Sequence, residues 1–467
     1  MVNGGPGTSR PPRTIVVGAG PAGLAAATAL ARAELPLTVL EAQALAGGWC
    51  RTEHLAGYSF EIGPQTWRTP IGSPLEQLIR WAGLEAEVRP PSPSAKRRFV
   101  LWRGALQPVP RALPALLGPR PLLRFLCEAI RPGRPRPRET VGAFLRRRFG
   151  PEITPLADAF VSGVFAGDPE RLELASAFPS LAQAEAVFGS VIRASRCGGF
   201  PVREIAGLRG GLGSLSEALA EDLGPLLRCG HRVQGLLPSS RRESSDDALP
   251  WQVFAGEARL EAERLVLGLP AYAAAELLAP HDPHLGGLLR GIPYADVAVV
   301  SLGFDPSAFP EGPPEGFGFL VPRCEGRRIL GCIYASSLFA DSAPEGKVAL
   351  RVLIGGARDP GAVELSEAEL LETALRELTQ ILGLAHGPGE TAIPEVHRVL
   401  RLRRAIPQYL PGHAARVQAI EEAVKGHPGL VLVGNAYRGV SLSDTIADAL
   451  LQVQPLLTSA ASLTSPG

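Results

Sequence analysis

Residues 13–41 are the stretch that most constrains the fold of this chain. Residues 14–17 are a β-branched, apolar run typical of a buried parallel strand, and residues 24–33, rich in Ala and Leu, predict a helix. A second apolar strand is predicted over residues 37–40 and ends on Glu41. The pattern G-x-G-x-x-G lies between the first strand and the helix. The whole arrangement predicts a dinucleotide-binding βαβ unit.

Each glycine of this pattern has an expected role. Gly18 permits the tight turn, Gly20 lets the backbone approach a pyrophosphate, and Gly23 lets the helix pack closely on the strand. The helix N-terminus offers N–H groups and a positive dipole end to the phosphates. Glu41, 18 residues after Gly23, is placed to accept hydrogen bonds from ribose hydroxyls. The alternative is a glycine-rich turn in an ordinary α/β core.

Composition excludes several classes of protein. The chain has 467 residues, enough for two or three domains, and its net charge of +1 gives no overall attraction for nucleic acid. The six cysteines have no CxxC or zinc spacing, which favours free, buried thiols in a reducing compartment. His281 and His284 form an HxxH pattern without a further ligand nearby, so we expect no metal site. Neither a signal peptide nor a membrane-spanning run is visible.

Two later segments repeat the strand–glycine–helix order and predict a return to the nucleotide site. Residues 208–213, LRGGLG, lead into a helix, and the segment 208–270 is expected to extend the doubly wound sheet. Residues 429–448 again indicate a strand, a glycine turn and a helix. A flavin requires such a distant segment around its ring system, so FAD is the favoured cofactor. Residues 458–467 are predicted to be a disordered tail.

Two other regions are predicted to lie outside this nucleotide-binding part. Residues 96–110 indicate a β-hairpin that begins with a basic triplet, and residues 294–356 indicate strands of an antiparallel or mixed sheet. Residues 111–148 carry ten arginines against two glutamates, a local net charge of +8 on short apolar helices. This pattern is typical of a membrane-contacting helical region, but also of a helical subdomain whose arginines face water.

The chain resembles the oxygen-dependent protoporphyrinogen oxidases, within the superfamily of flavin amine oxidases and phytoene desaturases. The superfamily motifs are VVGAGPAGL, the GG pair at 47–48 and GGLGSL. The more specific motifs are KRRF, FVSGVFAGDP, GFGFLVP, YASSLF, AIPQY followed by Gly412 and His413, and GNAYRGVSLSD.

The resemblance implies an α/β fold with three domains. A Rossmann-like FAD-binding domain of the amine-oxidase type is expected over 11–85, 205–290 and 415–460. A mixed-sheet substrate domain is expected over 86–110 and 291–414. An inserted all-helical domain, 111–204, is expected to contact a membrane.

The resemblance also implies an activity. The expected reaction is FAD-dependent oxidation of protoporphyrinogen IX to protoporphyrin IX, a late step of heme biosynthesis. Six electrons leave in three rounds as hydride to flavin N5, O2 is the acceptor and H2O2 the product, so no side chain is singled out as catalytic. Three alternatives stay open: oxidation of coproporphyrinogen III, a flavin amine oxidase, and a non-catalytic tetrapyrrole carrier. We expect a cytoplasmic protein, peripheral on the inner face of the cell membrane. The partner hypotheses are hand-over to a ferrochelatase-type enzyme and a homodimer.

Residue roles follow from the resemblance position by position. Arg98 is expected to pair with a substrate propionate, and Gly163 to line the pocket through its backbone. Leu320 and Phe339 are expected to sandwich a pyrrole ring. The expected cofactor contacts are Gly18, Ala19, Gly20, Pro21, Ala22, Gly23, Glu41, Ala42, Gly48, Gly63, Pro64, Gln65, Thr66, Val233, Val440, Ser441 and Leu442.

Finer expectations concern the ends of the cofactor. Val233 is expected to contact adenine through its backbone, and residues 440–442 to close over the isoalloxazine ring. Two positions depart from the family pattern and predict weaker cofactor contacts. Leu45 and Ala46 stand where relatives usually carry an arginine before the glycine pair, and Leu402 stands where many carry a tryptophan near the flavin.

Overall fold

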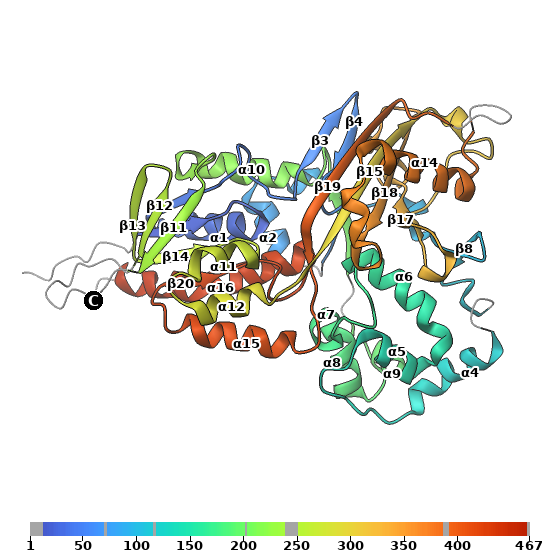
Figure 1. The fold of residues 1–467 in the computed structure, drawn as a ribbon, viewed down its shortest axis with the longest axis horizontal. Helices are drawn as coiled ribbons and strands as arrows, with labels where there is room; N and C mark the ends of the chain where they lie inside the picture. Colours follow the sequence, from blue (N-terminus) through green and yellow to red (C-terminus); the bar gives the residue numbers. More distant parts are fainter. Residues whose placement is uncertain are drawn as a thin grey trace, which may run out of the picture.

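The structure is a computed structural model that describes residues 13–69, 72–114, 118–200, 203–238, 251–385 and 392–464. Figure 1 shows three regions: a parallel sheet between helices at the left, a larger sheet at the upper right, and a group of helices at the lower right. Segments distant in sequence meet in the first two regions, and the third is built from one continuous stretch, residues 118–200.

The parallel sheet has five strands in the order β10–β2–β1–β14–β20. All neighbours pair in parallel, as expected for a buried α/β sheet. The strands predicted over Thr14–Val17 and Leu37–Leu40 are confirmed as β1 and β2. The other strands are β10 (Leu227–Arg228), β14 (Arg264–Leu267) and β20 (Leu430–Leu432).

Alternate side chains of this sheet pack into two separate cores. Val16, Val39 and Val266 face the helices α1, α2, α10 and α16. Ile15, Leu40 and Leu265 face the other side, against α11, α12 and α15. The first group of helices is α1 (Pro21–Arg32), α2 (Pro74–Trp81), α10 (Gly213–Leu223) and α16 (Leu442–Thr464). The second is α11 (Ala271–Leu278), α12 (Pro283–Arg290) and α15 (His413–Val424).

The prediction that residues 208–270 extend the parallel sheet is correct only in part. The strands β10 and β14 do so, but β11 (Val233–Pro238), β12 (Trp251–Ala255) and β13 (Ala258–Ala262) form a separate antiparallel sheet. Because only two residues join β12 to β13, these strands must run antiparallel. Their apolar side chains, including Trp251 and Val253, cover the second face of the parallel sheet.

The larger sheet has seven strands in the order β19–β15–β18–β17–β16–β7–β8. The hairpin predicted over residues 96–110 is confirmed as β7 (Arg98–Trp102) and β8 (Ala105–Val109). It joins the sheet through parallel pairing of β7 with β16, and every other pair is antiparallel. The remaining strands are β15 (Tyr294–Phe304), β16 (Gly318–Leu320), β17 (Ile329–Ile333), β18 (Val348–Gly355) and β19 (Val396–Pro407).

Two helices belong to this second region. The helix α14 (Glu367–Leu382) buries Leu370, Ala374 and Leu378 against the seven-stranded sheet, and α13 (Ala335–Leu338) follows β17. Two small sheets also occur. One contains β3 (Thr52–Leu55) and β4 (Tyr58–Glu61); the other contains β5 (Trp67–Thr69), β9 (Glu204–Leu208) and β6 (Val88–Arg89).

The third region contains helices whose arginines do not all behave as predicted. Arg147 lies 2.7 Å from Glu139 and 2.8 Å from Glu185, and Arg148 is buried in an ion pair with Glu128. Both predicted settings, water and membrane, are therefore wrong for these two arginines. Their partner Glu185 lies outside the arginine-rich stretch 111–148. The helices are α4 (Pro119–Cys127), α5 (Val141–Phe149), α6 (Thr154–Phe165), α7 (Leu174–Ala177), α8 (Pro179–Phe188) and α9 (Val191–Arg196).

Two smaller predictions also need correction. The helix α16 continues to Thr464, so residues 458–464 are helical instead of a disordered tail, while 465–467 lie outside the described residues. All six cysteines are free, but only Cys50 and Cys332 are buried. Cys127, Cys197 and Cys324 are exposed, because each lies in a surface helix or turn. Across the described residues, no helix combines the length and apolarity needed to cross a bilayer.

Candidate cofactor and substrate site

The glycines of the first βα turn form an open cradle at the start of α1. A Cβ on Gly18 would lie 2.5 Å from the carbonyl oxygen of Gly268, and one on Gly23 would lie 1.9 Å from that of Gly18. A Cβ on Gly20 would meet nothing within 4 Å. Gly20 is also the N-cap of α1, where backbone N–H groups are unpaired. The open space beside Gly20 therefore fits a pyrophosphate group.

Glu41 is held at the end of β2 by backbone donors. Its Oε2 accepts a hydrogen bond of 2.7 Å from the Ala19 N–H, and its Oε1 accepts one of 2.8 Å from the Gln43 N–H. The chain just before Val233 runs alongside, since the His231 N–H donates to the Glu41 carbonyl over 2.8 Å. Each carboxylate oxygen retains a lone pair for a ribose hydroxyl. The three segments thus meet where the nucleoside half of a dinucleotide is expected.

The turn over residues 63–66 is fixed by a buried arginine that the sequence analysis missed. The Arg351 guanidinium donates to the carbonyl oxygens of Ile62 over 3.1 Å and of Gly63 over 2.5 Å. The side chain is 5% exposed, and burial lowers its pKa to about 10. A single arginine inside the apolar strand VALRVLIG was the available signal. Arg351 joins the seven-stranded sheet to the turn expected to line the flavin.

Glu61 connects this turn to the second glycine-rich segment, residues 208–213. Its Oε1 accepts a hydrogen bond from the Leu212 N–H over 2.8 Å, and its Oε2 accepts one from the Thr52 hydroxyl over 2.9 Å. The Thr52 hydroxyl in turn accepts from the Gly213 N–H over 2.9 Å. Burial raises the pKa of Glu61 to about 7, while these hydrogen bonds oppose the shift. The carboxyl is therefore part of the scaffold of the site and titrates near neutral pH.

Thermal unfolding should report this titration. The unfolded carboxyl has a pKa of 4.5 and the folded one about 7, so the folded state binds the proton more tightly. The contribution of Glu61 to stability is then greatest below pH 4.5 and is lost as the pH rises through about 7. In Glu61→Gln, the fall of the melting temperature between pH 5.5 and pH 8 should be smaller than in the unchanged protein. Equal slopes in differential scanning calorimetry would contradict this.

The C-terminal segment 435–442 is anchored by the AIPQY and Gly-His motif. The Tyr409 hydroxyl donates to the Asn435 carbonyl over 2.5 Å, and the His413 Nε2 lies 3.1 Å from the Tyr437 carbonyl oxygen. Burial lowers the pKa of His413, which favours a neutral ring that donates this hydrogen bond. Ser441 then caps α16, accepting from the Asp444 N–H over 3.1 Å. These contacts fix the backbone of residues 440–442, which are expected to close over the flavin.

Three of the four expected substrate residues are brought together. The register pairs Gly318 with Arg98, which places Arg98 and Leu320 on the adjacent strands β7 and β16. A Cβ on Gly163, from α6, would lie 2.6 Å from the Leu320 Cδ2, so the helix and the strand touch here. The Arg98 guanidinium lies 5.1 Å from the centre of the Phe317 ring. A cation and an apolar wall thus adjoin each other.

Phe339 lies deeper than the other three. It is 4% exposed, and its ring packs against Gly207 and under the Arg89 guanidinium, 4.4 Å from the ring centre. It belongs to an apolar cluster that also contacts Phe317. No sequence motif singled out Arg89, whose pKa burial lowers to about 10. Phe339 therefore belongs to the cluster against which the Phe317 ring packs, and Arg98 lies over that ring.

Two exposed apolar side chains of α6 also escaped the sequence analysis. Phe160 is 49% exposed and Val164 is 43% exposed. Phe160 and Val164 are four residues apart, and Phe160 is three residues before Gly163, so Phe160 is a surface neighbour of both. Exposed apolar residues beside the Gly163–Leu320 contact extend the apolar wall.

The two departures from the family pattern differ in position. Leu45 is 64% exposed, so its side chain lies mostly in solvent. Leu402, on β19, is 7% exposed and packs in a cluster that contains Ile62. Leu402 therefore fills the space behind the 63–66 turn with an aliphatic side chain.

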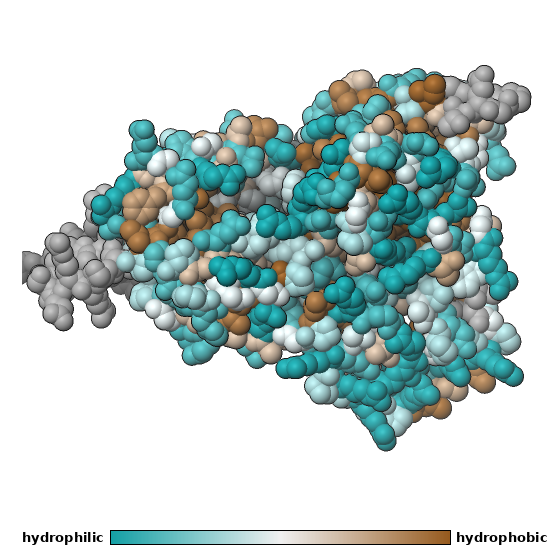
Figure 2. Space-filling model, viewed as in Figure 1, coloured by the Kyte–Doolittle hydropathy of each residue, from teal (hydrophilic) through white to brown (hydrophobic). Residues whose placement is uncertain are grey.

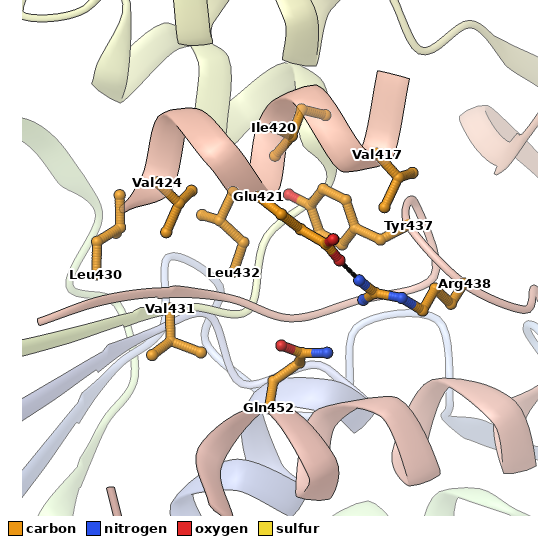
Figure 3. A pocket seen from close by; sticks show the side chains of 10 residues that line it. All are labelled: Val417, Ile420, Glu421, Val424, Leu430, Val431, Leu432, Tyr437, Arg438 and Gln452. Atoms are coloured by element: carbon orange, nitrogen blue, oxygen red, sulfur yellow. Dashed lines mark ion pairs between the residues drawn. The ribbon is translucent and has the colours of Figure 1, made fainter. Parts of the chain in front are cut away.

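A separate cavity lies at the β20 edge of the parallel sheet, between α15 and α16. Its volume is about 110 Å³, well below the several hundred Å³ typical of cofactor and drug-sized ligand sites. Figure 3 shows Tyr437 between the helix and the strand, with the Glu421–Arg438 ion pair beside it. The cavity is too small for a flavin or a tetrapyrrole. Its lining residues are Val417, Ile420, Glu421, Val424, Leu430, Val431, Leu432, Tyr437, Arg438 and Gln452.

Comparison with known proteins identifies the class to which this site belongs. Residues 21–456 match the model of the flavin containing amine oxidoreductases, and the chain belongs to this family. It is therefore an oxidoreductase, and the prediction of a flavin cofactor is confirmed at this level.

Within the family, the chain is similar to protoporphyrinogen and coproporphyrinogen oxidases. It is 32% identical to the chloroplastic protoporphyrinogen oxidase 1 of Arabidopsis thaliana, over 96% of this chain and 88% of the relative. It is 28% identical to the coproporphyrinogen III oxidase of Bacillus subtilis, over 95% of this chain and 97% of the relative. A crystal structure from Exiguobacterium sp., whose proposed activity is that of a protoporphyrinogen oxidase, superposes with a TM-score of 0.79 at 26% identity, covering 96% and 99% of the two chains.

Proposed function

We propose that this protein is an FAD-dependent protoporphyrinogen oxidase, which converts protoporphyrinogen IX to protoporphyrin IX with O2 as the acceptor. The observation that carries the proposal is the contact of Gly163 with Leu320 beside Arg98. Leu320 and Arg98 belong to the seven-stranded sheet, and Arg351 of the same sheet holds the 63–66 turn. The similarity to the Arabidopsis enzyme over nearly the whole chain supports the same assignment.

The residues of the chain supply binding and position in this reaction. Bound FAD supplies the two-electron oxidation in each of three rounds and passes the electrons to O2. Arg98 holds a propionate by charge-assisted hydrogen bonds, which orients the macrocycle. The apolar wall of Gly163 and Leu320 accepts the macrocycle face and excludes water. For the cofactor, the Gly20 cradle and Glu41 hold the ADP half, and residues 63–66 and 440–442 hold the flavin half.

A spectroscopic mixing experiment tests the proposal. Purified protein loaded with FAD should lose its yellow flavin absorbance on anaerobic mixing with protoporphyrinogen IX. Admission of air should restore the absorbance and produce porphyrin fluorescence together with H2O2. A flavin that stays oxidised in the presence of protoporphyrinogen would contradict the proposal and favour a non-catalytic carrier. Turnover of simple amines in its place would favour a flavin amine oxidase.

Coproporphyrinogen III is the second candidate substrate, since the Bacillus subtilis relative carries that activity in its name. It has four carboxylates, whereas protoporphyrinogen has two. We favour protoporphyrinogen because the more similar relatives are protoporphyrinogen oxidases. Comparison of kcat/KM for the two substrates, in one preparation, decides between them.

We also propose that the helical region is peripheral on an anionic membrane. Leu123, Leu126 and Ile130 are 62%, 59% and 79% exposed, and all lie in or just after α4. Figure 2 shows apolar residues at the lower right of the molecule, where Figure 1 places α4. Exposed arginines follow in the chain at 131, 134, 136 and 138. Apolar side chains beside cations favour an anionic lipid surface.

Sedimentation with vesicles tests the membrane proposal. The protein should bind vesicles that contain phosphatidylglycerol and bind less as salt is raised, because part of the attraction is electrostatic. The double variant Leu123→Glu, Leu126→Glu should lose about tenfold or more of this binding. Leu451→Glu is a matched control, since Leu451 is 66% exposed on the distant helix α16. Equal binding by both variants would contradict the proposal.

The remaining proposals concern organisation. We propose a division of the chain into an FAD-binding domain (11–85, 205–290, 415–460), a substrate domain (86–110, 291–414) and a helical domain (111–204). We further propose a cytoplasmic location at the inner face of the cell membrane. A homodimer is tested by light scattering, and transfer of porphyrin to a ferrochelatase-type enzyme by a coupled assay.

A further inference from the structure

Arg358 connects α6 to the chain that follows β16. Its Nη1 donates to the Val321 carbonyl oxygen over 2.6 Å. Its Nη2 donates to the Asp158 Oδ2 over 2.7 Å and to the Ser162 hydroxyl over 2.9 Å. The side chain is 7% exposed, so these contacts are shielded from water. One guanidinium thus joins the helix and the sheet at three points.

These contacts are made to the immediate neighbours of two expected substrate residues. Ser162 directly precedes Gly163, and Val321 directly follows Leu320. Gly163 and Leu320 themselves touch, since a Cβ on Gly163 would lie only 2.6 Å from the Leu320 Cδ2. The guanidinium therefore spans the same gap between helix and strand that these two residues close.

The surroundings make this junction rigid. Asp158 also accepts a hydrogen bond of 2.6 Å from the Arg323 N–H, which lies two residues beyond Val321. The end of α6 is fixed as well, because the Ala357 N–H donates to the Ala166 carbonyl over 2.7 Å. Hydrogen bonds therefore hold α6 at Asp158 and at Ala166, and the contacts of Arg358 with Ser162 lie between these two points.

We propose that Arg358 is a positioning residue that sets the separation of Gly163 and Leu320 and thereby the shape of the apolar wall for the tetrapyrrole. This inference rests on the proposed function and adds to it a residue that does not touch the substrate. Arginine suits the role because its planar fork reaches three acceptors at once in fixed directions. A lysine at this position carries the charge but cannot hold Val321 and Ser162 together.

The first test compares two arginine–aspartate pairs in the FAD-loaded protein. In Arg358→Met, KM for protoporphyrinogen should rise about tenfold or more, while kcat changes less than about threefold, since the wall binds substrate and takes no part in electron transfer. Arg358→Lys should recover little of the loss. The control is Arg328→Met: Arg328 pairs with Asp359 at 2.6 Å, and its described contacts do not include α6. The control should leave KM unchanged.

The second test is a double-mutant cycle of Gly163→Ala and Arg358→Lys. A purely structural role of Arg358 would produce no coupling between the two substitutions in porphyrin binding. Gly163→Ala forces Leu320 away, and in the fixed wall of the unchanged protein it should weaken binding of protoporphyrin IX, measured by fluorescence quenching. In the Arg358→Lys background the wall can move, so the further loss caused by Gly163→Ala should be at least about threefold smaller. The cycle also uses Arg358→Lys in case Arg358→Met does not fold.

Two results would overturn the inference. One is strict additivity of Gly163→Ala and Arg358→Lys in porphyrin binding. The other is an Arg358→Met protein that only melts earlier, with the KM of the Arg328→Met control. Failure of the proposed function is distinguishable, because then the unchanged protein itself would neither bind protoporphyrin IX nor oxidise protoporphyrinogen, and the inference would fall with it.

Discussion

Gly20→Ala should yield a stable protein that binds FAD poorly, whereas Gly23→Ala should yield an unstable one. A methyl group on Gly20 meets no protein atom within 4 Å, so folding is unaffected. It enters the space expected for the pyrophosphate, and the loss of one charge-assisted hydrogen bond weakens FAD binding about tenfold to a hundredfold. A methyl group on Gly23 would lie 1.9 Å from the Gly18 carbonyl oxygen, which lowers the free energy of unfolding by about 1–3 kcal/mol.

Two measurements separate these effects. Urea unfolding of the flavin-free proteins should give the unchanged midpoint for Gly20→Ala and a lower one for Gly23→Ala. Flavin fluorescence titration should then show the weaker binding of Gly20→Ala. Gly361→Ala is a comparison outside the cradle, because a Cβ there likewise meets nothing within 4 Å and the residue has no positive φ. Normal FAD affinity in Gly20→Ala would show that the cofactor lies elsewhere.

Arg98→Ala should raise KM for protoporphyrinogen about ten- to 150-fold and change kcat much less. The reason is that Arg98 holds a propionate far from the reacting carbon, and one charge-assisted contact is worth about 1.5–3 kcal/mol. Among the described residues, Arg98 has no carboxylate partner, and desolvation with the nearby charge of Arg68 lowers its pKa. An unpaired, partly desolvated guanidinium is ready to accept an anion.

The adjacent residue provides a matched control. Arg97 differs from Arg98 in that it forms an ion pair with Glu315 at the surface. Arg97→Ala should therefore leave KM within about twofold, since exposed ion pairs contribute little. Steady-state kinetics at saturating O2 measures both variants. A large fall of kcat at unchanged KM in Arg98→Ala would contradict the positioning role.

The sequence predicts local structure well where one segment decides it. The strands over Thr14–Val17 and Leu37–Leu40 coincide with the two apolar runs, because buried parallel strands are apolar on both faces. The hairpin of β7 and β8 follows from its turn at Arg103 and Gly104, both with positive φ. The sheet to which β11 belongs could not be predicted, because an alternating pattern identifies a strand but not its partner.

The site is predictable to the same extent. The spacing of the glycines and of the acid at the end of the second strand is itself the motif, so residues 18–23 and Glu41 could be found from the sequence. Arg351 and Arg358 could not, since their partners lie about 290 and 200 residues away. The same reason explains Arg147 and Arg148: a local charge count omits partners such as Glu185, which are brought close only by the fold.

The way in which the two sheets are threaded has a consequence for how this protein is made. The strand β7 pairs with β16 about 220 residues later, and β1 lies in the same sheet as β20 at residues 430–432. Any single cut between residues 110 and 260 therefore separates strands of both sheets. On the ribosome, neither sheet can close until almost the whole chain has emerged, so unpaired strand edges stay exposed throughout synthesis. We expect such a chain to fold slowly and to depend on chaperones that shield those edges.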